Sequence, residues 1–184
     1  MKKILTFMIL TMLVALTVAC SDNSNEKDIN EDVTLGELKQ AVVDVLGENY
    51  WPNAIIPPDT LKVVYGVSED MYEEALAEMP MISANVDTMI LIRAKADKVE
   101  EVEKALNEYR DKMINDTMQY PMNVGKIQAS RIETFGNFVC FIQLGGDTME
   151  VSENGDEAVI RHCQQENEKA LDAIGKIIAG ENNK

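Results

Sequence analysis

The chain has 184 residues, of which 46% are hydrophobic, and 32 acidic against 17 basic residues give it a formal net charge of −15. This length is sufficient for one domain with a hydrophobic core. A surface of this charge repels nucleic-acid phosphates and anionic lipid headgroups, so we expect no nucleic-acid partner. The simplest role of the charge is solubility, because no localised acidic cleft for a cationic ligand is recognisable in the sequence.

Residues 1–20 have the pattern of an export signal. Lys2 and Lys3 precede an apolar run over residues 4–19, and small residues precede Cys20. The run is shorter than the roughly 20 residues of a stable bilayer span. A buried core helix is disfavoured, because the run has no polar face to turn toward water. We therefore interpret residues 1–20 as a signal peptide.

The end of this signal resembles the lipobox of bacterial lipoproteins. Ala19 and Cys20 fit that pattern, whereas Thr17 stands where the family usually has Leu. The resemblance implies that the Cys20 thiol receives a diacylglyceryl group and becomes the new amino terminus. Two or three acyl chains on one residue give durable anchoring, which a single chain does not. We expect Cys20 to anchor the protein on the extracytoplasmic face of the cell membrane, with ordinary secretion and a free Cys20 as the alternative.

The segment behind Cys20 is polar. Residues 21–33 are rich in Ser, Asn, Asp and Glu and hold too little apolar surface to order themselves. We expect residues 21–33 to be a flexible tether and residues 34–180 to form a single domain.

The first half of that domain is predicted to be helical. Thr34 and Glu37 match a capping box, and the apolar spacing that follows predicts a helix that fades near Asn49. Trp51 is expected to act as a lid on the core rather than as a binding platform. Two short helices are expected next, one capped by Asp59 and ended by Gly66, the other capped by Ser68 and stopped by Pro80. The inward residues of the second are Met71, Ala75, Leu76 and Met79.

Three strands are predicted in the second half. Residues 89–95 read as the first, and a long helix from Asp97 to before Pro121 follows it. Residues 127–135 and 138–144 read as a hairpin joined by Gly136 and Asn137. The polar second strand is expected at an edge and the apolar third strand in the centre. This predicts an α+β fold with a small three-stranded antiparallel sheet, order 1-3-2, in a split β-α-β arrangement packed with four to five helices.

The last helix is predicted to bury Ile160, Cys163, Leu171, Ile174 and Ile178, and to stop at Gly180. An exported cysteine pair is able to form a disulfide, but Cys140 lies in the apolar third strand and Cys163 on the apolar stripe of the last helix, which favours two buried thiols. The neighbours Phe138 and Ile142 of the first thiol, and Ile160 of the second, offer no activating cation, which disfavours a catalytic thiol.

His162 is the only histidine in the chain, and it shares a helix face with Glu166. This i,i+4 spacing occurs in metal sites, but no third ligand accompanies the pair. The single histidine also leaves no Ser-His-Asp arrangement unless His162 itself serves in one. We therefore predict no catalytic, cofactor-binding or metal-binding residues and no cofactor; Cys20 is the one site that the sequence assigns.

Several local strings resemble one family. Residues 64–67 (Val-Tyr-Gly-Val), 79–81 (Met-Pro-Met), the strand at 89–95, residues 97–100 (Asp-Lys-Val-Glu) and residues 136–139 (Gly-Asn-Phe-Val) look like the domain of unknown function 4358 (DUF4358) family of lipoproteins, over about residues 34–145. The resemblance implies a lipid-anchored extracytoplasmic α/β domain. It implies no activity, and no catalytic residue is carried over.

Two functions of different classes are consistent with these features. The first is a non-enzymatic module that binds a partner protein, an envelope polymer or a small molecule at the cell envelope. The second is an envelope hydrolase that uses two carboxylates held roughly 5–9.5 Å apart in a cleft. A pocket with two facing, partly buried carboxylates favours the enzyme, and an exposed apolar patch favours the module.

Overall fold

A computed structural model describes residues 29–82 and 84–181 of the chain. Cys20, the rest of the expected signal peptide and residues 21–28 of the expected tether lie outside the described residues. Along the described chain the elements are α1 (Leu35–Leu46), a 3₁₀ turn (Gly47–Asn49), β1 (Ala54–Ile55), α2 (Pro58–Tyr65), β2 (Tyr72–Met79), β3 (Thr88–Ala94), α3 (Val99–Asn115), α4 (Pro121–Ala129), β4 (Arg131–Phe135), β5 (Phe138–Gln143), α5 (Met149–Ser152) and α6 (Asp156–Ile178).

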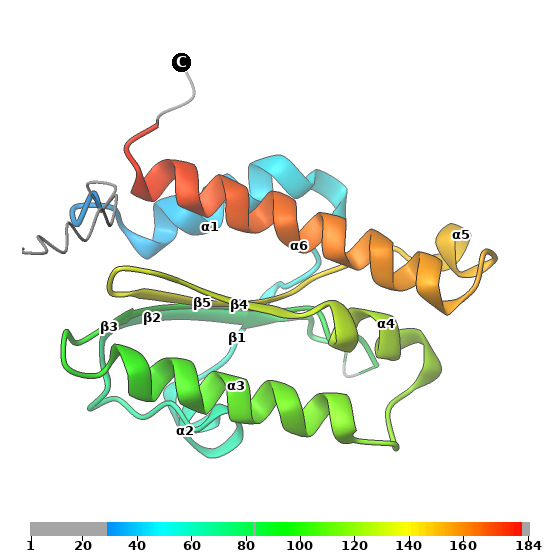
Figure 1. The fold of residues 1–184 in the computed structure, drawn as a ribbon, viewed down its shortest axis with the longest axis horizontal. Coiled ribbons are helices and arrows are strands. Elements are labelled where there is room, and N and C mark those ends of the chain that lie inside the picture. Colours follow the sequence, from blue (N-terminus) through cyan, green and yellow to red (C-terminus); the bar gives the residue numbers. More distant parts are fainter. Residues whose placement is uncertain (1–28, 83, 182–184) are drawn as a thin grey trace, which may run out of the picture.

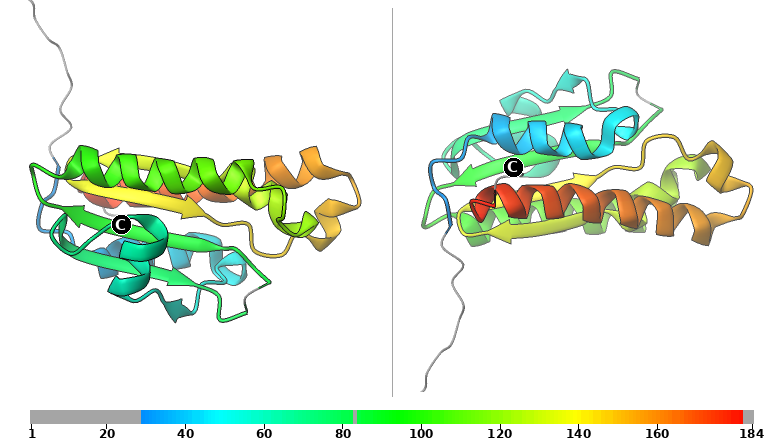
Figure 2. Two further views of the ribbon diagram at one scale, coloured as in Figure 1. Left: turned by 90° about the horizontal axis from the view of Figure 1, so that it is seen from below. Right: turned by 90° about the horizontal axis from the view of Figure 1, so that it is seen from above.

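The described chain folds into three layers, with one antiparallel sheet between two layers of helices (Figure 1). Helices α1 and α6 lie side by side over one face of the sheet, and α2 and α3 cover the other face (Figure 2). Each face has its own hydrophobic core. Met89, Leu91 and Cys140 point toward α1 and α6, whereas Ile90 and Phe141 point toward α2 and α3. Because successive side chains of a strand alternate between faces, β3 and β5 are apolar on both sides.

The sheet has five strands in the order β1-β2-β3-β5-β4, so the expected three-stranded sheet is wrong. Two strands were not predicted: the two-residue β1, and β2, which lies in the segment predicted to be a helix after Ser68. The Ala- and Glu-rich composition of β2 favours a helix in isolation, but Leu76 pairs with Leu91 in β3 and Ala77 pairs with Ile90. Pairing with β2 provides hydrogen-bond partners for the backbone groups on the edge of β3 that faces away from β5. This tertiary requirement outweighs the local helix propensity of the β2 segment.

The expected strands otherwise keep their relative order, since β5 lies between β3 and β4. Gly136 and Asn137 join β4 to β5 as predicted. Gly136 has a φ of +59° and no other residue type has a positive φ in the described chain, which fits a type II′ hairpin turn. Helix formation continues to Ala129, so the strand predicted from residue 127 begins at Arg131 instead. Pro121 at the first turn starts this helix, a position that suits its fixed φ.

The helix starts are partly as predicted. Thr34 and Glu37 form the expected capping box of α1. Pro57 rather than Asp59 is the N-cap of α2, while Gly66 ends that helix as expected. The described chain contains six α-helices against the four to five predicted, the extra ones being the short α4 and α5.

Residues 29–33 lie against the domain, although the sequence analysis placed them in the tether. Val33 is buried, the Asn30 amide donates to the Ile178 carbonyl over 2.8 Å, and the Arg93 guanidinium donates to the Glu31 and Val33 carbonyls. The described chain therefore enters the domain beside the β4–β5 hairpin and the C-terminal end of α6.

Candidate functional site

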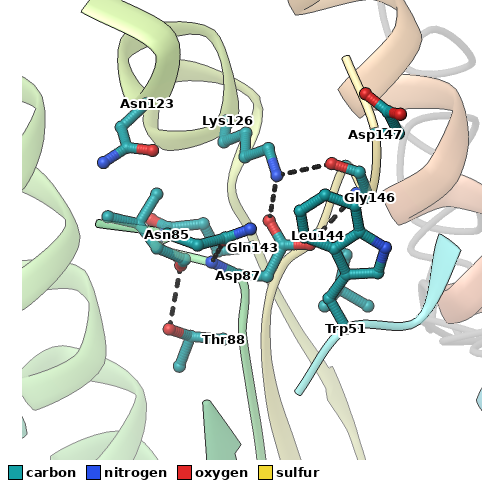
Figure 3. A network of polar contacts seen from close by, with 12 residues as sticks. Trp51, Asn85, Asp87, Thr88, Asn123, Lys126, Gln143, Leu144, Gly146 and Asp147 are labelled. Carbon is teal, nitrogen blue, oxygen red and sulfur yellow. Dashed lines mark hydrogen bonds and ion pairs between the residues drawn. The ribbon is translucent and has the colours of Figure 1, made fainter. Parts of the chain in front are cut away.

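A buried ion pair lies where β3 begins and β5 ends (Figure 3). The Lys126 ammonium of α4 donates to Asp87 Oδ1 over 2.7 Å and to the Gly146 carbonyl over 2.7 Å. The Gly146 amide in turn donates to Asp87 Oδ2 over 3.0 Å. The side chains of Asp87 and Lys126 are 0% and 4% exposed, so this cluster is shielded from solvent.

Trp51 covers this pair, with its ring centroid 5.0 Å from Lys126 Nζ. Trp51 is 40% exposed and covers a buried ammonium instead of the hydrophobic core that it was expected to cover. Burial raises the pKa of Asp87, and the Lys126 ammonium and the backbone amides of Gly145 and Gly146 oppose that rise. Gly146 has a φ of +55°, and a Cβ there would lie 2.7 Å from Asn49 Cα. The turn therefore requires glycine.

The hydrogen-bonding capacity of this cluster is used internally. Two Lys126 donors bind oxygen atoms and the ammonium faces an aromatic ring, while both Asp87 oxygens accept hydrogen bonds. Throughout residues 29–82 and 84–181, no buried side-chain nitrogen or oxygen lacks a hydrogen-bond partner. A catalytic acid or base needs a proton or lone pair directed at substrate. The cluster is therefore built to fix the structure.

His162 and Glu166, whose i,i+4 spacing alone did not predict a metal site, lie next to this cluster. His162 Nε2 is 3.1 Å from the Gly145 carbonyl oxygen. Glu166 accepts from Lys169 over 2.6 Å and from Asn49 over 3.3 Å, so its carboxylate is held by protein partners. Within the described ranges no group of three or more His, Cys, Asp or Glu side chains is arranged to hold a metal ion.

Cys140 and Cys163 are both buried and free, in agreement with the favoured prediction of two buried thiols. Burial raises the pKa of Cys140 to about 12 and that of Cys163 to about 11. Thiolate is the reactive form, so neither residue is suited to nucleophilic catalysis.

A groove of about 830 Å³ lies at the other end of the sheet, between β4 and the C-terminal half of α6. Phe135, Leu171 and Ile178 contribute apolar surface to it. Gly175 allows α6 to approach the strand closely, since a Cβ there would lie 3.3 Å from Phe135 Cε1. The remaining lining residues are Ile29, Glu31, Arg131, Glu133, Glu168, Asp172, Lys176, Ala179 and Glu181.

The groove follows an unpaired edge of the sheet, because β4 pairs with β5 alone. Phe135 and Phe138 flank the two-residue turn and form the hydrogen-bonded pair there. By alternation, Ile132 and Thr134 direct their backbone N–H and C=O groups away from β5. Such an edge is a template for pairing with another extended chain.

A second exposed feature lies at the opposite end of the domain, where two neighbouring segments carry large apolar side chains. The Asn123 amide donates to the Ala84 carbonyl over 3.0 Å and joins these segments. Met81, Ile82, Met118, Tyr120 and Met122 are each 62–87% exposed and form what we term the distal patch. Exposed patches of this kind mark interaction surfaces.

Sequence reasoning missed the groove and the ion pair. Glu168 and Asp172 are like charges at i,i+4 spacing on one helix, where they repel one another. This spacing was the one feature of the sequence that pointed to a charged rim. The predicted site residue, Cys20, lies outside the described residues. No helix in the described part of the chain has the length and apolar character that crossing a membrane requires.

The fold is that of a small α+β domain in which one antiparallel sheet has an unpaired edge at β4 beside the groove. A family model described as domain of unknown function (DUF4358) matches residues 53–144, and the chain belongs to this family. That match covers β1 to the end of β5 and includes both Asp87 and Lys126, whereas α6 lies beyond it. No curated protein and no solved structure matches the chain.

Proposed function

We propose that this protein is a non-enzymatic binding module, anchored through lipidated Cys20 on the extracytoplasmic face of the cell membrane. Its ligand site is the groove between β4 and α6. The observation that carries the proposal is the groove itself, about 830 Å³ with an apolar floor and a charged rim. Ligand sites commonly have this size and combine apolar walls with a few polar groups.

The position of the groove suits an anchored protein. Ile29 lines the groove and is nine residues from Cys20. A fully extended chain spans at most about 3.6 Å per residue, so the groove would lie within about 30 Å of the anchor. The ligand is thus a partner protein, an envelope polymer or a small molecule that comes close to the membrane surface.

The anchor is tested by membrane fractionation of cells producing Cys20→Ala, with Ser24→Ala as the matched control. We expect Cys20→Ala to move to the soluble fraction, because it loses the thiol that accepts the lipid, and Ser24→Ala to stay with the membrane. Membrane retention of a processed Cys20→Ala protein would contradict the anchor.

Binding is tested by recording backbone amide shifts of the ¹⁵N-labelled protein while envelope peptides, glycan fragments and lipids are added as separate fractions. We expect one fraction to shift amides in residues 131–135 and 168–179. The competing carboxylate hydrolase predicts release of reducing ends from the glycan fraction. Release of that kind, or the absence of groove shifts with every fraction, would overturn the proposal.

A further inference from the structure

The rim of the groove is acidic. Its ionisable residues are Glu31, Arg131, Glu133, Glu168, Asp172, Lys176 and Glu181. The Arg131 guanidinium lies 3.3 Å from a Glu133 carboxylate oxygen, so these two charges compensate one another. Acidic residues outnumber basic ones among the rest, which gives the rim a net negative potential.

Glu168 and Asp172 are two carboxylates of this rim that no ion pair with another described residue neutralises. They are exposed, lie one turn apart on α6, and neither forms an ion pair within 4.0 Å with any other described residue. Like charges at this spacing destabilise a helix by a few tenths of a kcal/mol. A cation placed between them would remove the repulsion.

The floor of the groove requires apolar contact from the same ligand. Phe135, which is half-buried, and Ile29, which is 39% exposed, present an apolar strip beside the acidic rim, whereas Leu171 and Ile178 are only 6% and 2% exposed. A simple metal cation or polyamine would leave this strip wet. The complementary ligand is therefore both basic and partly apolar.

The shape of the groove indicates an extended chain. The β4 side contributes five residues, about 17 Å at the rise of a strand. Residues 168–179 of α6 form the other side over a similar length of about 18 Å. The outward backbone groups of Ile132 and Thr134 suit pairing with a strand added at this edge.

We propose that the groove binds a basic, partly apolar peptide segment in extended conformation, paired along the free edge of β4 with a basic side chain between Glu168 and Asp172. This inference rests on the proposed function and specifies its ligand. The bound segment contributes a sixth strand, its apolar side chains cover Phe135 and Ile29, and its charge gives specificity.

The test uses fluorescein-labelled heptapeptides in which valine alternates with lysine, glutamine or glutamate. The fluorescence anisotropy of each peptide is recorded as the full-length protein is added. It should show binding of the lysine peptide, at least tenfold weaker binding of the glutamine peptide and no binding of the glutamate peptide. The double variant Glu168→Gln/Asp172→Asn should lose at least tenfold in affinity for the lysine peptide. The matched control Glu108→Gln/Asp111→Asn removes two exposed carboxylates one turn apart on α3, across the sheet, and should change affinity less than twofold.

Strand pairing is tested separately with a lysine peptide that is N-methylated at alternate residues. The methylated amides cannot donate backbone hydrogen bonds to the edge of β4, so this peptide should bind at least tenfold more weakly. Equal affinity for the lysine and glutamine peptides, or an unchanged affinity of the Glu168/Asp172 variant, would overturn the proposal. Equal affinity for the methylated peptide would overturn the extended mode. If an envelope fraction still shifts groove amides in these cases, the binding module stands and only its ligand class is wrong.

Discussion

The two ends of the domain hold their charged side chains in opposite ways. At one end, Asp87 and Lys126 are almost fully buried and form a 2.7 Å ion pair with further partners on both sides. At the other end, Glu168 and Asp172 stand exposed at the rim of a groove without an ion-pair partner among the described residues. The first arrangement leaves nothing for a ligand to bind, whereas the second leaves charge and apolar surface available.

This difference separates stability from binding. The low dielectric around a buried ion pair strengthens its interactions when every polar group has a partner. Removing one member strongly destabilises the fold, because the other charge stays buried without its counter-ion. Exposed carboxylates contribute little to folding and are free to exchange partners. We therefore expect substitutions at the ion pair to change the free energy of unfolding, and substitutions at the groove to change ligand affinity.

The largest effect is expected for Lys126→Met. Removing the ammonium leaves the Asp87 carboxyl buried without its counter-ion, so we expect a loss of about 3–5 kcal/mol in the free energy of unfolding. Guanidinium denaturation measures this loss. Exposed Lys112→Met on α3 is the control and should stay within about 0.5 kcal/mol.

The double variant Lys126→Met/Asp87→Asn sharpens this comparison. Asn has no charge to leave unpaired and retains an oxygen for the Gly146 amide, so the double variant should be more stable than Lys126→Met alone. If Lys126→Met costs less than about 1 kcal/mol, or if the two substitutions are simply additive, the pair does not act as a coupled structural element.

A smaller effect is expected from alkaline pH. The pKa of the Cys140 thiol is about 12 in the fold and that of Cys163 about 11, against about 8.5 in an unfolded chain. Above about pH 8.5 the unfolded chain binds fewer protons, so the free energy of unfolding falls as pH rises, by up to about 1.4 kcal/mol per pH unit for each thiol. Denaturation between pH 8.5 and 10 measures the slope.

Replacing one thiol provides the control for that slope. Cys140→Ala lowers stability at every pH through lost packing, but it should also reduce the pH slope by about half. An unchanged slope would mean that other groups, such as the buried tyrosines whose pKa values are also raised, dominate the alkaline response.

Local signals in the sequence were sufficient for the elements that are stabilised locally. The capping box of α1, the Gly136–Asn137 turn and the buried stripe of α6 each lie within a few residues of the pattern that predicts them. Strand β2 was missed because its composition favours a helix, and only pairing with β3 selects the strand. Local propensity predicts secondary structure only weakly where tertiary contacts of this kind compete with it.

The candidate site was out of reach for a similar reason. Its two sides, residues 131–135 and 168–179, are separated by β5, α5 and the N-terminal half of α6, and folding brings them together. Asp87, Lys126 and Gly146 are also far apart in the chain, with separations of 39 residues from Asp87 to Lys126 and 20 residues from Lys126 to Gly146. No acidic cleft is recognisable in the sequence, because the acidic residues of the groove come together only after folding.

The smallest expected effect is a gain in stability for Glu168→Gln. This change removes the repulsion between Glu168 and Asp172 but keeps the favourable i,i+4 spacing of Asp172 and Lys176, so the free energy of unfolding should rise by about 0.2–0.5 kcal/mol. Glu153→Gln, which removes the same charge from an exposed turn, should have no measurable effect. The gain should disappear at 1 M salt, where the Debye length falls to about 3 Å. A loss of stability in Glu168→Gln would show that this carboxylate is committed within the fold, and the contrast between the two ends of the domain would then not hold.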